Sequence, residues 1–521
     1  MANKYIAFKG GLDLASPRLE TKGGSLVEAY NCYESVKGGY TTIAGYESYS
    51  GKPAPSDAKD ELDADLRRNA INAPEGKGSI RGIAQILGVV LAWRNVGPLS
   101  VCYRATPDGW EVVPYADGFE PAALTATTVD YVNHNFYGGR DTFRCYFGDG
   151  VNQAQWYDPV NNIITPIEDS GVVAFVAAFS SRLIMSTTGG TFIASVEGDP
   201  TDLDGTLDAL EIGVGDEITA LKTTASDTLA IYTTRNTYGL SGTSANLDWR
   251  LKLISQNAGA SPHCVAQTDD VFASDDRGIY RLSRTETLGG FASATITDDI
   301  QPLFRRIAQK ASCATTIRRL NQMRFFYGTS IIIASQVEYN ANGANGIRYG
   351  MTEASYPKTP VLCVSTEEDT EGFEKTFFGS SDGFVYQMDK GRSYNGAEIP
   401  VKMTLAFNHF GTPTVNKRFM GIGIEAILME PTEFDCDYVM DDGQKTFEYR
   451  TATFPDGSAI WGLSEFDEAS FGNRPISRDK ISLKGTGYNL QLTFSRNSST
   501  DAQSTLTGYT IRLKERGQEP L

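Results

Sequence analysis

The sequence of 521 residues has little of what enzymes and metal sites are usually built from. It contains only three histidines, His134, His263 and His409, which lie far apart with no motif around any of them. It has no G-x-S-x-G nucleophile turn, no phosphate-binding loop and no H-E-x-x-H metal motif. We therefore expect no enzymatic activity and no catalytic, cofactor or metal residue. His134 in "YVNHNFYGG" has the residue type of a general base, but we expect a hydrogen-bonded structural role for it.

Cysteines and long apolar runs are also scarce. The cysteine count is odd and no C-x-x-C occurs, which argues against a disulfide framework and a zinc site and fits a reducing cytoplasm. No apolar run approaches the roughly 18 residues that a membrane span needs. The start "MANKYIAFKGG" has no long apolar core, so we expect no secretory signal. The seven cysteines are Cys32, Cys102, Cys145, Cys264, Cys313, Cys363 and Cys436.

Positive charge is in deficit. The chain has 47 basic and 64 acidic residues and a formal net charge of -17. A field of one sign repels phosphate backbones and anionic membranes at long range. The composition therefore argues against tight nucleic-acid binding. It remains compatible with a protein that surrounds nucleic acid without gripping it.

Helical periodicity is rare as well. Only Ser56–Ile71, with Ser56 as the expected cap and acids in the first turn, and Asp299–Ser312 are predicted to be helices. In the second, Ile300, Leu303 and Ile307 share one face with Phe304. Nearly all the rest is typical of short strands separated by Gly, Asp and Asn turns, with 11% aromatic residues.

What the sequence does contain is a recurring hairpin. The common form is a strand, a tight turn and a second strand, and a repeated antiparallel hairpin is typical of propeller blades. A single hairpin cannot bury both of its faces, whereas a ring of hairpins lets each blade pack on the next. We predict a β-propeller of six to seven blades, with a large β-sandwich as the alternative. The hairpins are Gly88–Ala105, Cys145–Asp158, Arg182–Ser195, Thr228–Gly242, Asp270–Ser283, Met323–Ser335 and Thr376–Asp389.

A different pattern begins near residue 395. Long strands alternate between apolar and polar residues, with Val401, Met403, Leu405 and Phe407 on one face and Met420, Ile422 and Ile424 on another. This period of two predicts a C-terminal β-sandwich. We therefore divide the chain into residues 1–80, a glycine-rich segment packing on the C-terminal platform, residues 81–395, the propeller, and residues 396–521, the sandwich.

Two polar stretches are candidate sites. Asp199, Asp202 and Asp204 in "GDPTDLDG" have calcium-ligand chemistry but lack EF-hand spacing, so we expect turn caps. The acidic run Ser365–Lys375 is expected to be a solvated loop. Paired carboxylates for glycoside cleavage depend on distance in the fold, which spacing in the sequence does not reveal.

The N-terminal segment Phe8–Gly51 combines spaced glycines with one proline, one asparagine and a Gly-Tyr step. With Thr234–Ser283, Gly411–Phe419 and Trp461–Gly517, in this order, it resembles the tail nozzle, or tail tubular protein B, family of short-tailed bacteriophages. The segments Pro53–Arg68 and Gly198–Gly213 have no clear counterpart in that family. The residues that carry the opening resemblance are Gly10, Gly11, Leu12, Pro17, Gly24, Asn31, Gly38, Gly39, Gly45 and Tyr46.

The resemblance implies a structural virion protein without enzymatic activity, assembled in the host cytoplasm. It implies a homohexameric ring at the distal end of the tail. One face would dock on the tail adaptor or tail tube protein, with tail fibres or spikes nearby. Packaged double-stranded DNA would be retained behind the ring and pass through it on ejection, without sequence-specific binding. We expect an acidic or small polar lumen, and slower ejection when it is neutralised.

One basic pair fits this picture. Lys417 and Arg418 stand at the mouth of a strand in an acidic chain, where basic residues offset repulsion between acidic subunits. We predict that they serve a subunit or platform interface; an exposed pair without a role is the alternative. The rival function is a propeller that binds or cleaves glycans.

Overall fold

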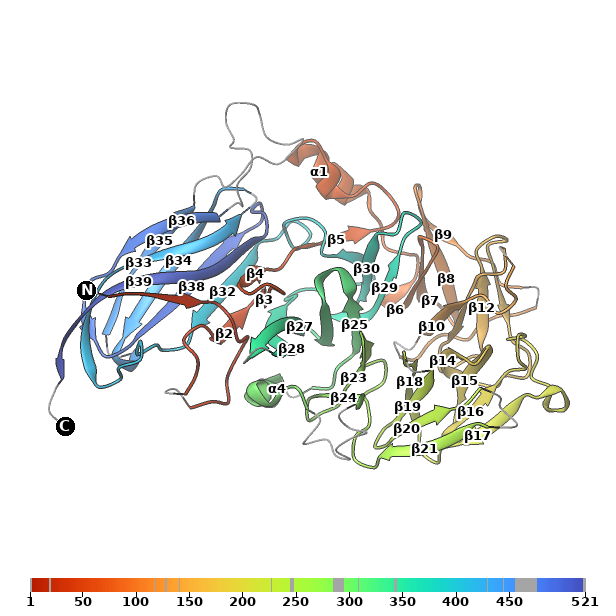
Figure 1. The fold of residues 1–521 in the computed structure, drawn as a ribbon. Helices are drawn as coiled ribbons and strands as arrows, with labels where there is room; N and C mark the ends of the chain where they lie inside the picture. Colours follow the sequence, from red (N-terminus) through yellow and green to blue (C-terminus); the bar gives the residue numbers. More distant parts are fainter. Residues whose placement is uncertain are drawn as a thin grey trace.

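The chain folds into a seven-sheet ring and a two-sheet sandwich that lie side by side (Figure 1). The computed structural model describes residues 2–518, apart from 18–19, 117, 127–128, 140, 226, 244–247, 284–294, 308, 342–343, 429, 444 and 455–475. Part of the C-terminal resemblance, residues 461–475, lies outside the described residues. No described helix is long and apolar enough to cross a membrane.

The ring is a seven-bladed β-propeller. Each blade is an antiparallel sheet whose strands follow one another in sequence, and the first strand of each contacts the first strand of the next. The contacts return from β29 to β6, so the ring is closed. The first three blades are β6–β9 (Lys77–Ile86, Val89–Val96, Leu99–Thr106, Gly109–Val112), β10–β13 (Asp130–His134, Arg144–Gly148, Gln155–Asp158, Ile163–Pro166) and β14–β17 (Val173–Phe179, Arg182–Thr187, Thr191–Ala194, Leu210–Gly213).

The remaining four blades complete the ring. The fifth has three strands among the described residues, and the seventh takes its outer strand from β5 near the N-terminus. These blades are β18–β21 (Ile218–Thr223, Thr228–Thr233, Thr237–Ser241, Arg250–Ser255), β22–β24 (Val265–Gln267, Val271–Ser274, Ile279–Arg281), β25–β28 (Cys313–Ile317, Gln322–Tyr327, Ser330–Ala341, Ala344–Ser355) and β29–β31 (Val361–Glu368, Glu374–Ser380, Val385–Met388) with β5 (Tyr46–Tyr49).

All seven predicted hairpins are confirmed, since each supplies the second and third strands of one blade. The second strands are the most buried, because they pack on blades at both faces. In β26 all six residues are buried, from Gln322 to Tyr327. The alternating apolar pattern therefore gives way to nearly continuous apolar runs in these strands.

The sandwich is built from both ends of the chain. One sheet has the order β3-β4-β39-β33-β36, with β1 also on β39 and β37 also on β33; the other has the order β2-β32-β38-β34-β35. Residues 1–80 thus contribute β1–β4 to the sandwich and β5 to the propeller. The strands are β1 (Ala2–Ala7), β2 (Leu26–Tyr30), β3 (Cys32–Glu34), β4 (Tyr40–Thr42), β32 (Ile399–Leu405), β33 (Val415–Leu428), β34 (Thr432–Met440), β35 (Lys445–Phe454), β36 (Ile476–Ser482), β37 (Thr486–Gly487), β38 (Leu490–Ser498) and β39 (Ser504–Gln518).

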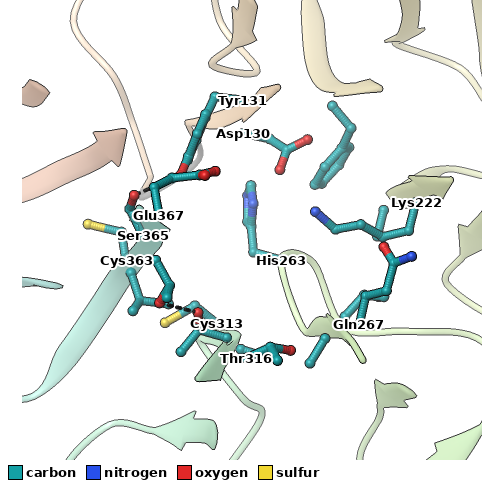
Figure 2. A pocket seen from close by; sticks show the side chains of 18 of the residues that line it. Asp130, Tyr131, Lys222, His263, Gln267, Cys313, Thr316, Cys363, Ser365 and Glu367 are labelled. Atoms are coloured by element: carbon teal, nitrogen blue, oxygen red, sulfur yellow. Dashed lines mark hydrogen bonds between the residues drawn. The ribbon is translucent and has the colours of Figure 1, made fainter. Parts of the chain in front are cut away.

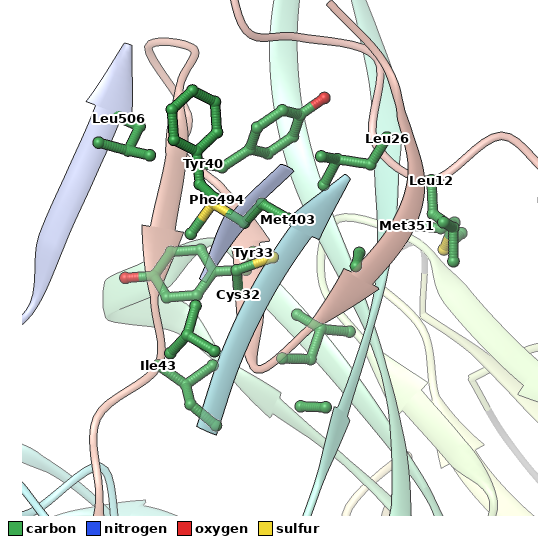
Figure 3. Packing of buried hydrophobic residues seen from close by; sticks show 14 of the residues in the cluster. Leu12, Leu26, Cys32, Tyr33, Tyr40, Ile43, Met351, Met403, Phe494 and Leu506 are labelled. Atoms are coloured by element: carbon green, nitrogen blue, oxygen red, sulfur yellow. The ribbon is translucent and has the colours of Figure 1, made fainter. Parts of the chain in front are cut away.

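One hydrophobic core runs through the sandwich and into the adjacent blades. Figure 3 shows side chains of the N-terminal segment, such as Leu12 and Tyr40, beside Met351 of a propeller strand and Phe494 of a sandwich strand. These side chains are buried in the same cluster. Burial of apolar area contributes roughly 25 cal/mol per Å², so separating the two regions would expose much of this stabilising surface.

The predicted alternation along β33 is wrong at one residue. Ile422 and Ile424 are buried as expected, but Phe419 is buried and Met420 is only partly so. A register shift between Phe419 and Gly421 against β39 explains the difference. A bulge inserts one residue and exchanges the faces of the strand beyond it.

Both predicted helices are present but shorter. α1 (Glu61–Ala70) is capped by Asp60, whose side chain accepts a hydrogen bond from the Asp63 amide, and not by Ser56. Ser56 lies in a preceding 3-10 turn, Pro55–Asp57. α4 (Gln301–Ile307) follows the 3-10 turn Asp298–Ile300, and its Leu303 and Phe304 are buried as predicted.

Candidate functional site

A cavity of about 450 Å³ lies on the axis of the propeller. Residues of the innermost strands of six of the seven blades line it: β10, β14, β18, β22, β25 and β29. Short consecutive runs of each inner strand contribute to the lining, so residues far apart in sequence face one another here. The ring thus gathers polar groups that no short motif contains.

Charges of both signs face this cavity. Figure 2 shows the carboxylates of Asp130 and Glu367 and the ammonium of Lys222 directed toward the space around the His263 ring. Asp130 Oδ2 accepts a hydrogen bond from the Val176 amide at 3.1 Å. The Lys222 ammonium makes no hydrogen bond or ion pair with any residue that the structure describes.

The Glu367 carboxyl belongs to a small hydroxyl network. The Tyr131 hydroxyl lies 2.7 Å from Ser365 Oγ and 3.4 Å from Glu367 Oε1. Burial raises the pKa of Glu367, while Tyr131, Arg318 and Lys222 act in the opposite direction. Burial also raises the pKa of Tyr131 well above its usual value. The phenol therefore remains protonated and able to donate.

His263 stands between two hollows. It lines the axial cavity and also a hollow of about 1070 Å³ at the end of the ring where the inner strands begin. Its ring lies 4.8 Å from that of Phe175, which also lines both. Burial lowers the pKa of His263, with Asp130 opposing and Lys222 reinforcing the effect. The imidazole is therefore neutral near pH 7.

The structure places the remaining sequence candidates away from this cavity. His134 packs its ring 4.2 Å from Phe136, and its Nδ1 is buried without a hydrogen bond, contrary to the predicted hydrogen-bonded role. Asp199 and Asp204 each accept hydrogen bonds from nearby threonines, as turn caps do. No group of three or more metal-ligating side chains occurs among the described residues.

The basic pair is split by the fold. Lys417 is fully buried, and its Nζ donates to the carbonyls of Thr412, Val415 and Tyr488 at 2.5, 2.7 and 3.1 Å. All three of its donors are used within the chain, so Lys417 is withdrawn from the predicted subunit interface and instead holds a loop inside the sandwich. Arg418 is exposed, and its interface role stays a prediction.

The acidic run Ser365–Lys375 is not simply a solvated loop. Its first residues end strand β29, with Ser365 buried and Glu367 facing the cavity. The turn itself is capped by Asp369, which accepts hydrogen bonds from the Glu371 and Phe373 amides. Sequence reasoning missed Asp130, Lys222 and Glu367 as a group, because only closure of the ring brings them together.

A second functional feature is the join between propeller and sandwich. Asn31 donates through Nδ2 to the Pro400 carbonyl of β32 at 2.7 Å and accepts from the Ser355 amide of β28 at 2.8 Å. Beside it, Arg348 of β28 forms a bidentate ion pair with buried Glu34 of β3. One asparagine and one ion pair thus tie the two regions together.

Comparison with known proteins gives only distant structural similarity. No protein-family model matches the chain, and no curated protein sequence matches it. Virginiamycin B lyase from Staphylococcus aureus is 10% identical, with a TM-score of 0.38 over 59% of this chain and 94% of that one. The WD40 domain of Toxoplasma gondii coronin is 10% identical, with a TM-score of 0.36 over 68% and 87%. The propeller assignment is carried by the sheet order described above.

Proposed function

We propose that the chain is a structural virion protein forming the distal nozzle ring of a short-tailed bacteriophage. In this role it retains packaged DNA and provides the channel for DNA ejection. The observation that carries the proposal is the placement of the opening segment Phe8–Gly51. Some of the residues through which it resembles the nozzle family, among them Gly11 and Asn31, contact the propeller from the sandwich, as expected of a component that must keep its shape under load.

The glycines of this segment support that interpretation. A Cβ on Gly24 would lie 2.0 Å from the Ala7 carbonyl oxygen, and one on Gly45 would lie 2.0 Å from that of Ser393. Gly11 has φ 68°, and its Cβ would lie 2.8 Å from the Met351 amide of the propeller. Each glycine therefore permits a backbone approach that a side chain would block.

The composition is consistent with a DNA channel. A ring of six copies would carry a formal charge of about -100, six times the -17 of one chain. A lumen of this sign repels the phosphate backbone and lets DNA pass without adhering. The partners in this role are five further copies of the chain, the tail adaptor or tail tube protein, and a tail fibre or spike protein.

Electron microscopy with gold-labelled antibody to this chain tests the proposal. Intact and DNA-emptied particles would be compared. Label at the distal tip of the tail in both states is the expected result. Absence of the chain from particles would overturn the structural role.

The axial cavity favours one second candidate, a propeller that binds or cleaves glycans. Asp130 and Glu367 both line it, and paired carboxylates are the machinery of glycoside hydrolysis. The purified chain would be incubated with host-surface polysaccharide and assayed for new reducing ends. Release of such ends, lost on Glu367→Gln, would support this candidate over the nozzle.

A further inference from the structure

We propose that the axial cavity binds a small zwitterion, namely an amino acid or a short peptide with a free carboxylate and a free ammonium. This goes beyond the proposed role in the tail, which requires no ligand in the propeller. The argument rests on the arrangement of charge in the cavity, on polar atoms left without partners, and on its size.

Lys222 provides the site for the carboxylate. Its ammonium points into the cavity (Figure 2) and has no ion-pair or hydrogen-bond partner among the described residues. Thr316, on β25 two blades further round the ring, also lines the cavity, and its hydroxyl is buried without a partner. A half-buried ammonium that lines the cavity and has no partner in the described part of the chain is available to an anionic group of a ligand. A ligand carboxylate would accept from the Lys222 ammonium.

Asp130 and Glu367 provide the site for the ammonium. Asp130 uses Oδ2 for the Val176 amide, and Glu367 uses Oε1 for the Tyr131 hydroxyl. The second oxygen of each carboxylate makes no hydrogen bond to a described residue. It is not among the fully buried atoms that lack a partner, so a ligand can reach it. These two oxygens can accept from two of the three donors of an ammonium group.

The size and walls of the cavity select a small ligand. A volume of about 450 Å³ lies at the lower end of the range for small-molecule sites. Short apolar residues, among them Val129, Ala220 and Val265, also line the cavity. A single anion would leave both carboxylates unpaired, and a single cation would leave Lys222 unpaired. A zwitterion satisfies both ends at once.

The probes are glycine, diglycine and triglycine, each with an N-acetylated and a C-amidated counterpart. Binding to the full-length chain is measured by saturation-transfer NMR and by titration calorimetry. We expect at least one free zwitterion to bind. Each blocked counterpart should bind at least about tenfold more weakly, because each block removes one charged hydrogen-bonding end. The chain length of the tightest probe then gives the span of the site.

Variants assign each end of the ligand. Lys222→Met is expected to weaken the free zwitterion about tenfold, while Lys222→Arg retains most of the binding. Glu367→Gln is expected to weaken it similarly. The matched controls are Lys252→Met on β21 of the same blade and Glu211→Gln on β17, both exposed on outer strands. They are expected to bind as the unchanged chain does, and thermal unfolding verifies that every variant is folded.

Several results would overturn the inference. These are no binding of any free zwitterion, equal binding of free and blocked probes, and binding that Lys222→Met leaves unchanged in a folded variant. Binding of neutral monosaccharides in preference to the zwitterions would also overturn it and would favour the glycan-binding function. Location of the chain in particles is measured separately, so the nozzle proposal and this inference fail independently.

Discussion

The propeller and the sandwich are both antiparallel β-structures, but they are assembled from the chain in opposite ways. In the propeller, neighbouring strands of a blade follow one another in sequence, and among the described strands only β5 comes from elsewhere. In the sandwich, β1 pairs with β39 and β2 pairs with β32, so opposite parts of the chain meet. Local pairs need short loop closures, whereas the sandwich needs contacts between distant segments.

The difference makes residues 2–49 the connection on which both regions depend. They supply four strands to the sandwich and the closing strand to the propeller. Without β5, strand β31 of the last blade would present an unpaired edge. We therefore expect the two regions to unfold together while the N-terminal segment is in place, and separately once it is loosened.

The largest effect is expected from Tyr46→Ala. The Tyr46 ring lies 4.7 to 5.5 Å from four other aromatic rings, and its hydroxyl lies 2.6 Å from Thr359 Oγ1. Truncation of a large buried ring costs about 3–5 kcal/mol. Denaturant unfolding followed by fluorescence and by circular dichroism should show a lower midpoint, with the two probes no longer coincident.

The matched control is Phe373→Ala, at the turn of the same blade. Its ring is 63% exposed, so the free energy of unfolding should change by less than about 0.5 kcal/mol. A single coincident transition for Tyr46→Ala, at an unchanged midpoint, would show that β5 does not couple the regions.

Gly45→Ala tests the same connection without touching the aromatic cluster. The new methyl group would lie 2.0 Å from the Ser393 carbonyl oxygen, which is backbone and has to move. Overpacking of this kind costs about 1–3 kcal/mol. Gly205→Ala, whose methyl group meets nothing within 4 Å, serves as control and should be neutral or slightly stabilising in thermal unfolding.

Lys417→Met examines the sandwich alone. Removal of the ammonium leaves three carbonyls without their donor, at a cost of about 1–3 kcal/mol. The N-terminal segment is intact in this variant, so the two regions are expected to unfold together, at a lower midpoint. Arg418→Met, the exposed neighbour on the same strand, should change the free energy of unfolding by less than about 0.5 kcal/mol.

The pH dependence of this pair has a definite sign. Burial lowers the pKa of Lys417 from its ordinary 10.5, with Glu515 opposing the effect. Between the lowered pKa and 10.5 the unfolded chain binds more protons than the folded one, so this group makes stability rise with pH there. This rise of the free energy of unfolding with pH should be present in Arg418→Met and absent from Lys417→Met. Its presence in both would mean that another group is responsible.

The same contrast explains what the sequence reveals. The seven hairpins were predictable because both strands of each are adjacent and share a turn, as in Arg182–Ser195. The face of β32 was predictable from Val401, Met403 and Leu405, which are all buried. The pairing of β1 with β39 was not, since no local pattern records a partner so far along the chain.

The candidate site was beyond local patterns for a related reason. Asp130, Lys222 and Glu367 each look like ordinary polar residues at the end of a short strand, and Glu367 stands in a run that resembles a solvated loop. Their convergence depends on the number of blades and on closure of the ring. The bulge beside Phe419 is a similar case, because one inserted residue reverses an alternation that is otherwise regular.

The smallest effect, and the finest comparison of the two regions, concerns cysteine reactivity. Burial raises the pKa of Cys32 in the sandwich and of Cys363 beside the axial cavity, in each case to about 12. Cys363 is partly accessible, whereas the other six are buried. Because the thiolate is the reacting form, iodoacetamide should label Cys363 first, about tenfold faster per pH unit between pH 7 and 9. Mass spectrometry identifies the labelled residue. Equal labelling of Cys32 in the folded chain would mean that the reagent reaches the core of the sandwich as easily as it reaches Cys363 beside the propeller axis. The two regions would then not differ in the accessibility of their cysteines.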